Sequence, residues 1–401
     1  MRVVNAHNHH VGGGGMEVLF ESITTLLRER EHDVHVIERH NRDLRGLTGR
    51  LSAFGSMVYS PAAKREMAKV LADFKPDVVH LHNLYPQLSP SVIDACNEAG
   101  VPVVLAVQDY KLTCPTAQHL RDGKVCEKCL GGQEQWCAIH NCRGSVPMSI
   151  AYAIRNAAAR KSGRLHEGVT LYLACSEFAK RQIVRGGYDA AKTVVIPNFS
   201  ALPINDAPRG DGDYIAYVGR ISPEKGLPIL IEAARRLGVP VKIAGDTSKM
   251  PELPSTAPAN VEFVGPVARA ALPDFYRNAR CLVVPSVWYE GLPVVCAEAM
   301  GFGTPLVVSD IGGLAESIEP EVSGLLCPVG DVDAFTAAIA RYWNDADLAR
   351  AHGVQARERA REQFSLDAFY ERLISAYRRA TSAVDARVRS MSGSTVSTEP
   401  V

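Results

Sequence analysis

Short apolar runs alternate with amphipathic segments along nearly the whole chain. Continuous runs of Val, Ile, Leu and Ala predict strands at residues 34–37, 78–82, 101–107 and 171–175, and again at 214–219, 241–245, 261–265, 281–285 and 306–309. Between the first of these lie segments of helical periodicity, at residues 17–30, 62–74 and 90–99. Because the strands are apolar throughout rather than alternating, we expect parallel sheets covered on both faces, and hence an α/β fold of two βαβ-type domains.

Proline and glycine mark the expected domain boundary. Residues 196–203 contain Pro197 and Pro203, and the Gly- and Asp-rich residues 209–213 follow. This predicts an N-terminal domain over residues 1–198 and a C-terminal domain over residues 199–365. A last helix near residues 366–381 is expected to pack back on the N-terminal domain. Residues 390–401 are rich in Ser, Thr and small side chains, and we expect a disordered tail over residues 382–401.

Composition narrows the class of protein. The chain has 401 residues, with 44 Lys and Arg against 44 Asp and Glu, and 46% of its residues are hydrophobic. The balanced charge, without a basic stripe, argues against nucleic acid as a partner. No apolar run approaches the roughly 18 residues of a membrane helix, and none resembles a signal peptide. We therefore expect a cytoplasmic protein with reduced thiols, either free in the cytoplasm or at the inner face of the membrane.

Two glycine-containing segments could bind an anion. Gly14 and Gly15 end a run of four glycines that lies between a strand and a helix, where free N–H groups suit a phosphate; a simple glycine turn is the alternative. Gly219 begins the second segment, which adds Arg220 and Lys225 at the start of another helix. A guanidinium and an ammonium there suit a diphosphate, unless both are solvated surface charges.

A third segment, residues 285–300, places two carboxylates around a helix start. Pro293 suits the first turn of a helix, so Glu290 lies in the loop before the helix and Glu298 lies within it. Carboxylates can accept hydrogen bonds from ligand hydroxyls while the N–H groups between them take phosphate. A nucleotide sugar has both kinds of group, although paired glutamates are also common on solvated helices.

Taken together, these segments resemble the retaining glycosyltransferases of family 4. The motifs that carry the resemblance are Gly219-Arg220 with Lys225-Gly226, Glu290 and Glu298 separated by seven residues, the run 303–316, Gly324-Leu325-Leu326-Cys327-Pro328 and Ile196-Pro197-Asn198. The resemblance covers about residues 1–380 and is more specific in the second half. It implies the GT-B fold, in which two Rossmann-like domains face each other across a cleft.

The family implies a role for each matching position. Arg220 and Lys225 would hold the donor diphosphate and stabilise the leaving group. Glu290 would accept hydrogen bonds from the transferred sugar, and Glu298 from the ribose. Backbone contacts to phosphate or to the sugar–acceptor junction would come from Gly14, Gly15, Gly291, Leu292, Pro293, Val294 and Val295. No catalytic metal is expected, because cations and backbone supply the positive charge.

The first half departs from the family at one position. Where members commonly have His-Asp after a strand, near the donor sugar, this chain has Gln108-Asp109. Glutamine donates a hydrogen bond but cannot take a proton. His80 and His82 end the preceding strand and are further candidates for the acceptor side of the cleft; the alternative is that they are satisfied strand-end histidines.

Half of the ten cysteines fall between residues 114 and 142. Cys126, Cys129, Cys137 and Cys142 form a C-x2-C-x7-C-x4-C pattern without core periodicity, which predicts a structural zinc site. An iron–sulfur cluster, a redox-sensitive disulfide pair or no site at all are the alternatives, and Cys114 and His140 are reserve ligands. Some family 4 transferases look similar here, with a Cys-rich insertion at about residues 114–142.

Residues 145–167 combine apolar side chains with Arg155, Arg160, Lys161 and Arg164. Such a helix could dock on an anionic bilayer, since many transferases of this type use lipid-linked acceptors. A covering helix with a solvated basic face is the alternative.

The resemblance favours an enzyme that moves a sugar from a nucleotide diphosphate sugar to a hydroxyl acceptor, a sugar or a lipid-linked sugar, in surface polysaccharide or glycolipid assembly. Two rival classes remain. A GT-B nucleotide-sugar epimerase would use the same donor without an acceptor, and a non-catalytic protein would bind the nucleotide sugar without turning it over. The sequence does not specify the donor base, the sugar, the linkage or the oligomeric state.

Overall fold

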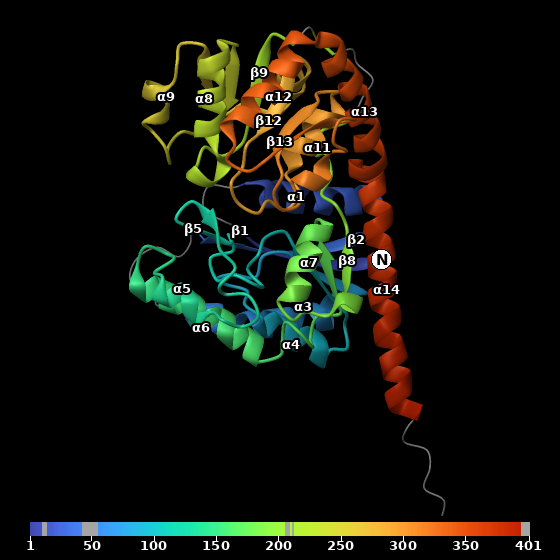
Figure 1. Ribbon diagram of the computed structural model, residues 1–401. Coiled ribbons are helices and arrows are strands. Elements are labelled where there is room, and N and C mark those ends of the chain that lie inside the picture. Colours follow the sequence, from blue (N-terminus) through green and yellow to red (C-terminus); the bar gives the residue numbers. More distant parts are fainter. Residues whose placement is uncertain (10–13, 42–54, 205–208, 211, 394–401) are drawn as a thin grey trace, which may run out of the picture.

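Two parallel six-stranded sheets organise the protein in a computed structural model that describes residues 1–9, 14–41, 55–204, 209–210 and 212–393 (Figure 1). The first sheet has the strand order β2-β1-β3-β4-β7-β8. Its strands are β1 (Arg2–His9), β2 (Asp33–His40), β3 (Val78–Leu81), β4 (Val103–Val107), β7 (Leu171–Ala174) and β8 (Thr193–Val195). The expected strands of the first half are therefore present, and all pairings in this sheet are parallel.

The second sheet has the order β11-β10-β9-β12-β13-β14, the strand order of a Rossmann fold. Its strands are β9 (Tyr214–Val218), β10 (Val241–Ala244), β11 (Val261–Gly265), β12 (Ala279–Val284), β13 (Leu306–Ser309) and β14 (Gly324–Cys327). The order in which strands are added across the sheet reverses between β1 and β3 in the first sheet and between β9 and β12 in the second. Ligands of open α/β sheets bind beside the carboxyl ends of strands at such points.

Helices cover both sheets. They are α1 (Gly15–Glu29), α3 (Pro61–Phe74), α4 (Ser91–Glu98), α6 (Val146–Lys161), α7 (Glu177–Arg185), α8 (Leu227–Leu237), α9 (Leu253–Thr256), α10 (Leu272–Arg277), α11 (Val294–Gly301), α12 (Val332–Asn344), α13 (Ala346–Phe364) and α14 (Leu366–Gly393). Local sequence explains several starts. Ser60, Ser176, Asp331 and Asp345 each accept a backbone N–H at the first turn of the helix that follows. None of the helices in the described residues is long and apolar enough to cross a membrane.

The last helix crosses back from the second domain and runs along the first (Figure 1). Phe369, Leu373 and Tyr377 of α14 share a buried cluster with Leu19 and Leu27 of α1. The expectation of a disordered tail from residue 382 is wrong over residues 382–393, which continue α14. Elongating an existing helix is cheap, and Ala and Arg in this stretch favour it over the Ser and Thr that suggested disorder. Residues 394–401 of the expected tail lie outside the described residues.

The cysteine-rich segment, residues 114–142, contains short elements although its sequence shows no core periodicity. Strands β5 (Leu120–Arg121) and β6 (Lys124–Val125) form an antiparallel pair, and helix α5 (Gln135–Ile139) follows. Helix α5 lies against α6 (Figure 1). The segment is therefore joined to the first domain by helix contacts as well as by the chain.

Candidate active site

Glycines bring two loops of the second domain into contact at the carboxyl ends of β9 and β12. Gly226 has φ 69°, and a Cβ atom there would lie 1.9 Å from the carbonyl oxygen of Pro285. A Cβ atom on Gly245 would lie 2.1 Å from the carbonyl oxygen of Gly219. A side chain at Gly226 would clash with Pro285, so Gly226 lets the loop of Lys225 approach the loop of Glu290. Gly245 instead lets the chain after β10 approach the loop after β9.

The two loops join Lys225 to Glu290 in a buried ion pair. Lys225 Nζ lies 2.6 Å from Glu290 Oε1, and the two side chains are only 15% and 8% exposed. Ser286 Oγ and Trp288 Nε1 each donate to the same carboxylate oxygen at 2.7 Å. Three donors therefore converge on one oxygen of Glu290.

These contacts keep Glu290 ionised. Burial alone would raise the pKa of its carboxyl, but the charge of Lys225 and the hydrogen bonds from Lys225, Ser286 and Trp288 outweigh burial and place the pKa below its ordinary value. The carboxylate is thus a fixed negative group that can accept hydrogen bonds.

Arg220 has a different environment. Its side chain is 49% exposed, and its Nη2 lies 3.3 Å from Glu224 Oε1. Because the guanidinium is half exposed, its remaining N–H donors are accessible to a further anionic partner. The second domain thus carries one buried and one accessible cation near the carboxyl end of β9.

Glu298 lies inside α11, where it is 5% exposed. Tyr276 Oη donates to Glu298 Oε2 at 3.0 Å. Burial raises the pKa of Glu298 to about 6, although the hydrogen bond from Tyr276 and the charge of Arg269 act in the opposite direction. The helix begins at Pro293 without a side-chain cap, so the N–H groups of Val294 and Val295 form the kind of helix start that accepts phosphate.

The turn at Glu290 and Gly291 also meets the first domain. Tyr110 Oη donates to the carbonyl oxygen of Glu290 at 2.9 Å, and Asn198 Nδ2 donates to that of Leu292 at 2.7 Å. A Cβ atom on Gly291 would lie 2.7 Å from Cys175 Sγ. The turn that holds the acidic side chain is therefore part of the contact between the two domains.

On the side of the first domain, a small cavity of about 40 Å³ lies at the carboxyl ends of β3 and β4. Met16, His82, Gln108 and Asp109 are among its lining residues. His82 Nε2 is 2.8 Å from Asn5 Oδ1, and Asp109 pairs with Lys111. Gln108, Asp109 and His82 thus line one cavity, and their role on the acceptor side stays a prediction.

His80 is not part of this cavity, and its assignment to the acceptor side is not supported by its position. The side chain is 1% exposed, and its Nδ1 lies 2.8 Å from Tyr377 Oη of α14. Burial lowers the pKa of His80 to about 3, so the ring is neutral. The alternative of a structural strand histidine describes it better, because a helix distant in sequence supplies the partner of Nδ1, while Nε2 has no hydrogen bond.

Gly14 and Gly15 start α1, with Gly14 as its N-cap and no side chain capping the helix. They therefore have the position predicted for them, at the start of the helix that follows β1. The first two glycines of the run, residues 12 and 13, lie outside the described residues.

The cysteines of the cysteine-rich segment are neighbours without forming a closed ligand set. Cys129 and Cys137 are buried in one cluster with Cys142 beside it, and all are free thiols. Burial, followed by the neighbouring cysteines, raises the pKa of Cys137 to about 12. Among the described residues, no three cysteine sulfurs fall within 4.8 Å of one another. The thiols have the chemistry of a zinc site, but their spacing is wider than bound zinc requires.

The predicted basic face of α6 is largely absent. Arg155 is buried and donates to the carbonyl oxygen of Pro115, Arg160 pairs with Glu134, and the nearby Arg164 pairs with Asp94. What α6 exposes instead is apolar: Val146, Met148, Ile150 and Ile154 are all more than 40% exposed. Periodicity could not reveal this, because the acidic partners lie far away in sequence.

Several residues around the site were not singled out from the sequence. Ser286 and Trp288 stand beside Glu290, and their polar side chains next to a carboxylate were an available signal. Tyr110 and Glu316 act across the domain contact: Glu316 accepts the backbone N–H groups of Glu177 and Phe178 at 2.7 and 2.6 Å, at the start of α7. No local pattern could have paired them.

Two family models match the chain in succession. Residues 14–198 match the "Glycosyl transferase 4-like domain", and residues 203–359 match "Glycosyl transferases group 1". The two matches meet between the two sheets. The chain belongs to the family 4-like glycosyltransferases and has the GT-B fold.

Individual relatives agree with this assignment. The chain is 33% identical over 241 residues to D-inositol 3-phosphate glycosyltransferase from Kribbella flavida, covering 55% of each chain. It is 28% identical over 206 residues to phosphatidyl-myo-inositol mannosyltransferase from Mycolicibacterium smegmatis, covering 48% of this chain and 53% of the relative. The chain thus spans about half the length of the curated relatives it matches.

Solved structures show the same fold over nearly the whole length. Sucrose-phosphate synthase from Thermosynechococcus elongatus superposes with a TM-score of 0.70 at 18% identity, covering 96% of this chain and all of that chain. HepE from Anabaena, solved in complex with UDP, gives a TM-score of 0.65 at 18% identity, covering 94% and 99%.

Proposed function

We propose that the protein is a retaining glycosyltransferase of the hexosyltransferase type, which moves a sugar from a nucleotide diphosphate sugar to a hydroxyl acceptor. The observation that carries the proposal is the buried pair of Lys225 and Glu290, beside the uncapped start of α11. An ammonium and a helix start suit a diphosphate, and a fixed carboxylate suits sugar hydroxyls. HepE, a protein of the same fold, has been solved with UDP and with UDP-glucose.

In this reaction, Lys225 and Arg220 neutralise the diphosphate as its bond to the anomeric carbon breaks. An ammonium has three N–H donors, so Lys225 can contact Glu290 and a phosphate oxygen together. Glu290 orients the sugar, and Glu298 accepts hydrogen bonds from the ribose. The acceptor attacks the face from which the nucleotide leaves, which retains the configuration. The transfer step needs no catalytic metal, because cations and the helix start supply the positive charge.

The acceptor side is proposed at the cavity lined by His82, Gln108 and Asp109. The exposed apolar side chains of α6 favour an acceptor linked to lipid, at the inner face of a membrane and in surface polysaccharide or glycolipid assembly. Sedimentation with anionic vesicles tests this contact. Wild type should sediment, and an Met148→Asp/Ile150→Asp variant should remain in solution; equal behaviour would remove the membrane from the proposal.

Donor binding is tested by thermal shift and calorimetry with a panel of nucleotide diphosphates and their sugars. We expect one base to stabilise wild type, with Lys225→Ala and Glu290→Gln weakening its affinity by about tenfold or more, as befits a lost charge-assisted contact. Lys69→Ala, which changes an exposed lysine of α3, is the control. Unchanged affinity in Lys225→Ala would refute the donor site.

Gln108 supports a second candidate, a protein that binds nucleotide sugar without transferring it. A glutamine in the cavity can position a ligand but cannot accept a proton. Product analysis distinguishes the candidates: a transferase consumes donor when an acceptor is added, an epimerase converts it without one, and a binding protein leaves it intact. Activity appearing only in Gln108→His would favour the binding protein.

A structural zinc held by Cys126, Cys129, Cys137 and Cys142 is also proposed, with Cys114 nearby. The support is that the thiol of Cys129 lies close enough to the other four thiols to interact electrostatically with each of them. Zinc would draw the sulfurs together and stabilise the segment. Metal analysis of the purified protein should find zinc that a Cys126→Ser/Cys129→Ser variant lacks.

A further inference from the structure

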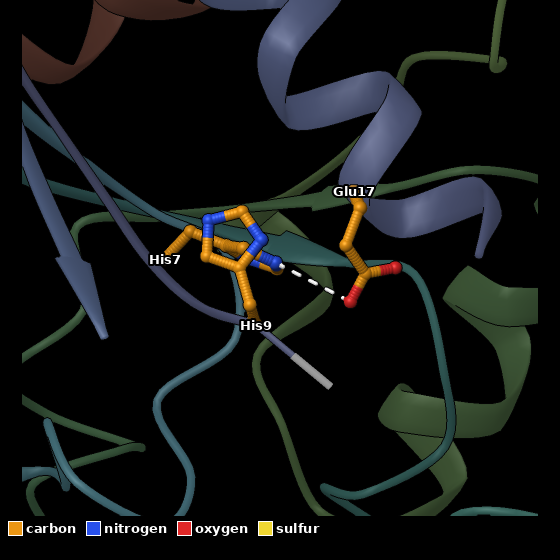
Figure 2. A group of neighbouring side chains, drawn as sticks. All are labelled: His7, His9 and Glu17. Atoms are coloured by element: carbon orange, nitrogen blue, oxygen red, sulfur yellow. Dashed lines mark ion pairs between the residues drawn. The ribbon is translucent and has the colours of Figure 1, made fainter. Parts of the chain in front are cut away.

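A cluster of buried metal-ligating side chains lies on the first domain, apart from the pair of Lys225 and Glu290. His7 and His9 come from β1 and Glu17 from the first turn of α1, and Figure 2 shows the three side chains converging. One ligand atom of each lies within 4.8 Å of those of the other two. All three residues are less than 9% exposed.

The local fold explains why these side chains meet. His7 and His9 are two residues apart on a strand, so they share one face of the sheet. Glu17 lies in the first turn of α1, and its carboxylate reaches the histidines at the end of β1. Phe20 holds the rings in place: it stacks on His7 with centroids 4.8 Å apart and meets His9 edge-on at 5.7 Å.

The two histidines have ring nitrogens without hydrogen bonds, although His7 Nε2 and His9 Nε2 each lie near a carboxylate, the latter 3.4 Å from Glu38 Oε1. Neither ring nitrogen of His7, which is fully buried, has a hydrogen bond, and His9 Nε2 also has none. His7 Nε2 and Glu17 Oε1 are 3.8 Å apart, too far for a hydrogen bond. Buried ring nitrogens nearly always have a partner, so the geometry calls for a group beside Glu17 that accepts a lone pair from each of the two imidazoles.

We propose that His7, His9 and Glu17 bind a divalent metal ion of the zinc class. Two imidazoles and one carboxylate form a donor set that suits Zn²⁺ and its first-row neighbours. The ion would offset the charge of the buried carboxylate and tie the start of α1 to β1. Three protein ligands leave positions open to water or to an oxygen of a bound molecule. This site uses nitrogen and oxygen, and its ligands are separate from the thiols of the cysteine-rich segment.

A second group, His9 with Glu38 and His40, overlaps the first but fits a metal less well. Glu38 is exposed, and the rings of His9 and His40 are stacked, 4.5 Å apart at 17°. Lone pairs of imidazole lie in the ring plane, so stacked rings do not direct them to a point between the rings. His7 and His9 are instead inclined at 85°, which allows convergence.

The test is a titration of the full chain, free of any histidine tag and stripped of metal, with Co²⁺ alone. Histidine and carboxylate ligands give visible d–d bands, whereas thiolates add a strong near-ultraviolet charge-transfer band, so the spectrum separates this site from the cysteines. We expect one equivalent of Co²⁺ to bind without producing the thiolate band, and the Cys126→Ser/Cys129→Ser variant should bind it as well. Glu17→Gln and His9→Gln should each lower the affinity for Co²⁺ by about a hundredfold or more. This loss is larger than that expected for a residue that only hydrogen-bonds a metal ligand.

Two controls make the outcome decisive. Glu38→Gln and His40→Gln should leave the equivalent unchanged, because they alter only the overlapping group. Glu17→Gln and His9→Gln preserve size, and a metal-free unfolding midpoint equal to that of wild type verifies the fold of at least one. Three results would each overturn the proposed site. Wild type could bind no Co²⁺ without the thiolate band, Glu17→Gln and His9→Gln could both still bind it, or His40→Gln could fail to bind it.

Discussion

Two glycines flank helix α8 with the same backbone conformation and different surroundings. Gly226 has φ 69° and Gly238 has φ 66°, yet a Cβ atom would meet the Pro285 carbonyl oxygen at 1.9 Å in the first case and nothing within 4 Å in the second. Conformational strain is thus shared by both positions, and steric exclusion acts at only one.

This contrast gives a prediction about stability. Gly238→Ala should lower the free energy of unfolding by about 1 kcal/mol, the cost of a left-handed alanine. Gly226→Ala should cost about 3 kcal/mol or more, because the two loops must separate. Urea unfolding of both variants measures the difference. Equal losses would show that the close approach of the loops contributes nothing.

Glu298 gives a prediction about pH. Burial raises its pKa to about 6 from the ordinary value of about 4.5, so the folded state holds the proton more tightly than the unfolded chain. The resulting contribution to the free energy of unfolding is fully present below about pH 4.5 and is lost as the pH rises through about 6, a total loss of about 2 kcal/mol. Glutamine does not titrate, so the free energy of unfolding of Glu298→Gln should rise relative to that of wild type by up to about 2 kcal/mol over this pH range.

Unfolding curves of wild type and Glu298→Gln across this range supply the measurement. A difference between them that does not change with pH would contradict the raised pKa. Nucleotide affinity should also fall in wild type below about pH 6, because a protonated carboxyl is a poorer acceptor of ribose hydroxyls.

At the scale of elements, helix α7 links the two domains by its N-terminus. Glu316 of the second domain accepts two backbone N–H groups there, and Ser176 accepts a third, that of Ala179. Glu316→Gln should weaken this cap by about 1 kcal/mol and increase hydrogen exchange at Glu177 and Phe178.

The exposed Glu319 nearby provides a matched control for this cap. Glu319→Gln should leave exchange at the start of α7 unchanged. Identical exchange in both variants would mean that Glu316 does not hold the domains together.

The cysteine-rich segment reaches the donor side at Tyr289, which Glu127 contacts by a hydrogen bond and His119 by a ring contact. Glu127 accepts hydrogen bonds from Arg185, Gln182 and Tyr289, and Arg185 is the leading cause that lowers its pKa to about 2. Tyr289 precedes Glu290, so the segment can influence the acidic side chain through the turn that carries it.

We predict that Glu127→Gln and Tyr289→Phe each weaken donor binding a few-fold, and that the double variant is no weaker than the worse single variant, because both remove one contact. Calorimetric titration with the nucleotide measures this. Asp122→Asn, an exposed change in the same segment, should have no effect. Strictly additive losses of donor affinity would show that Glu127 and Tyr289 act on donor binding independently.

At the scale of the whole molecule, α14 ties the end of the chain to the first domain. Tyr377 and Tyr370 both meet a histidine: Tyr377 Oη is 2.8 Å from His80 Nδ1 in the core, and Tyr370 Oη is 2.9 Å from the partly buried His32 Nε2. The two pairs share chemistry and differ in burial.

Tyr377→Phe should therefore cost about 1–3 kcal/mol, since it leaves a buried nitrogen unpaired, while Tyr370→Phe should cost less than about 1 kcal/mol because water can replace its hydroxyl. Thermal unfolding of both variants provides the comparison. A larger loss in Tyr370→Phe would place the main attachment of α14 at its exposed start.

Much of the architecture could be predicted without tertiary information. Apolar runs located the strands, and continuous burial on both faces indicated parallel sheets, because those features depend on neighbouring residues. The short β5–β6 pair and the extension of α14 to Gly393 were missed. The first has too few residues to show a period, and the second depends on a helix already started upstream.

The sequence by itself determined the α/β class, the order of the elements and the residue types of the donor side, since spacing places Lys225 and Glu290 beside strand ends. Only the tertiary structure decided which groups touch. Ser286 and Trp288 donate to one oxygen of Glu290, and Tyr377 of α14 pairs with His80. His7, His9 and Glu17 converge in the same way. Contacts between distant segments depend on how sheets and helices pack, and local periodicity carries no record of that.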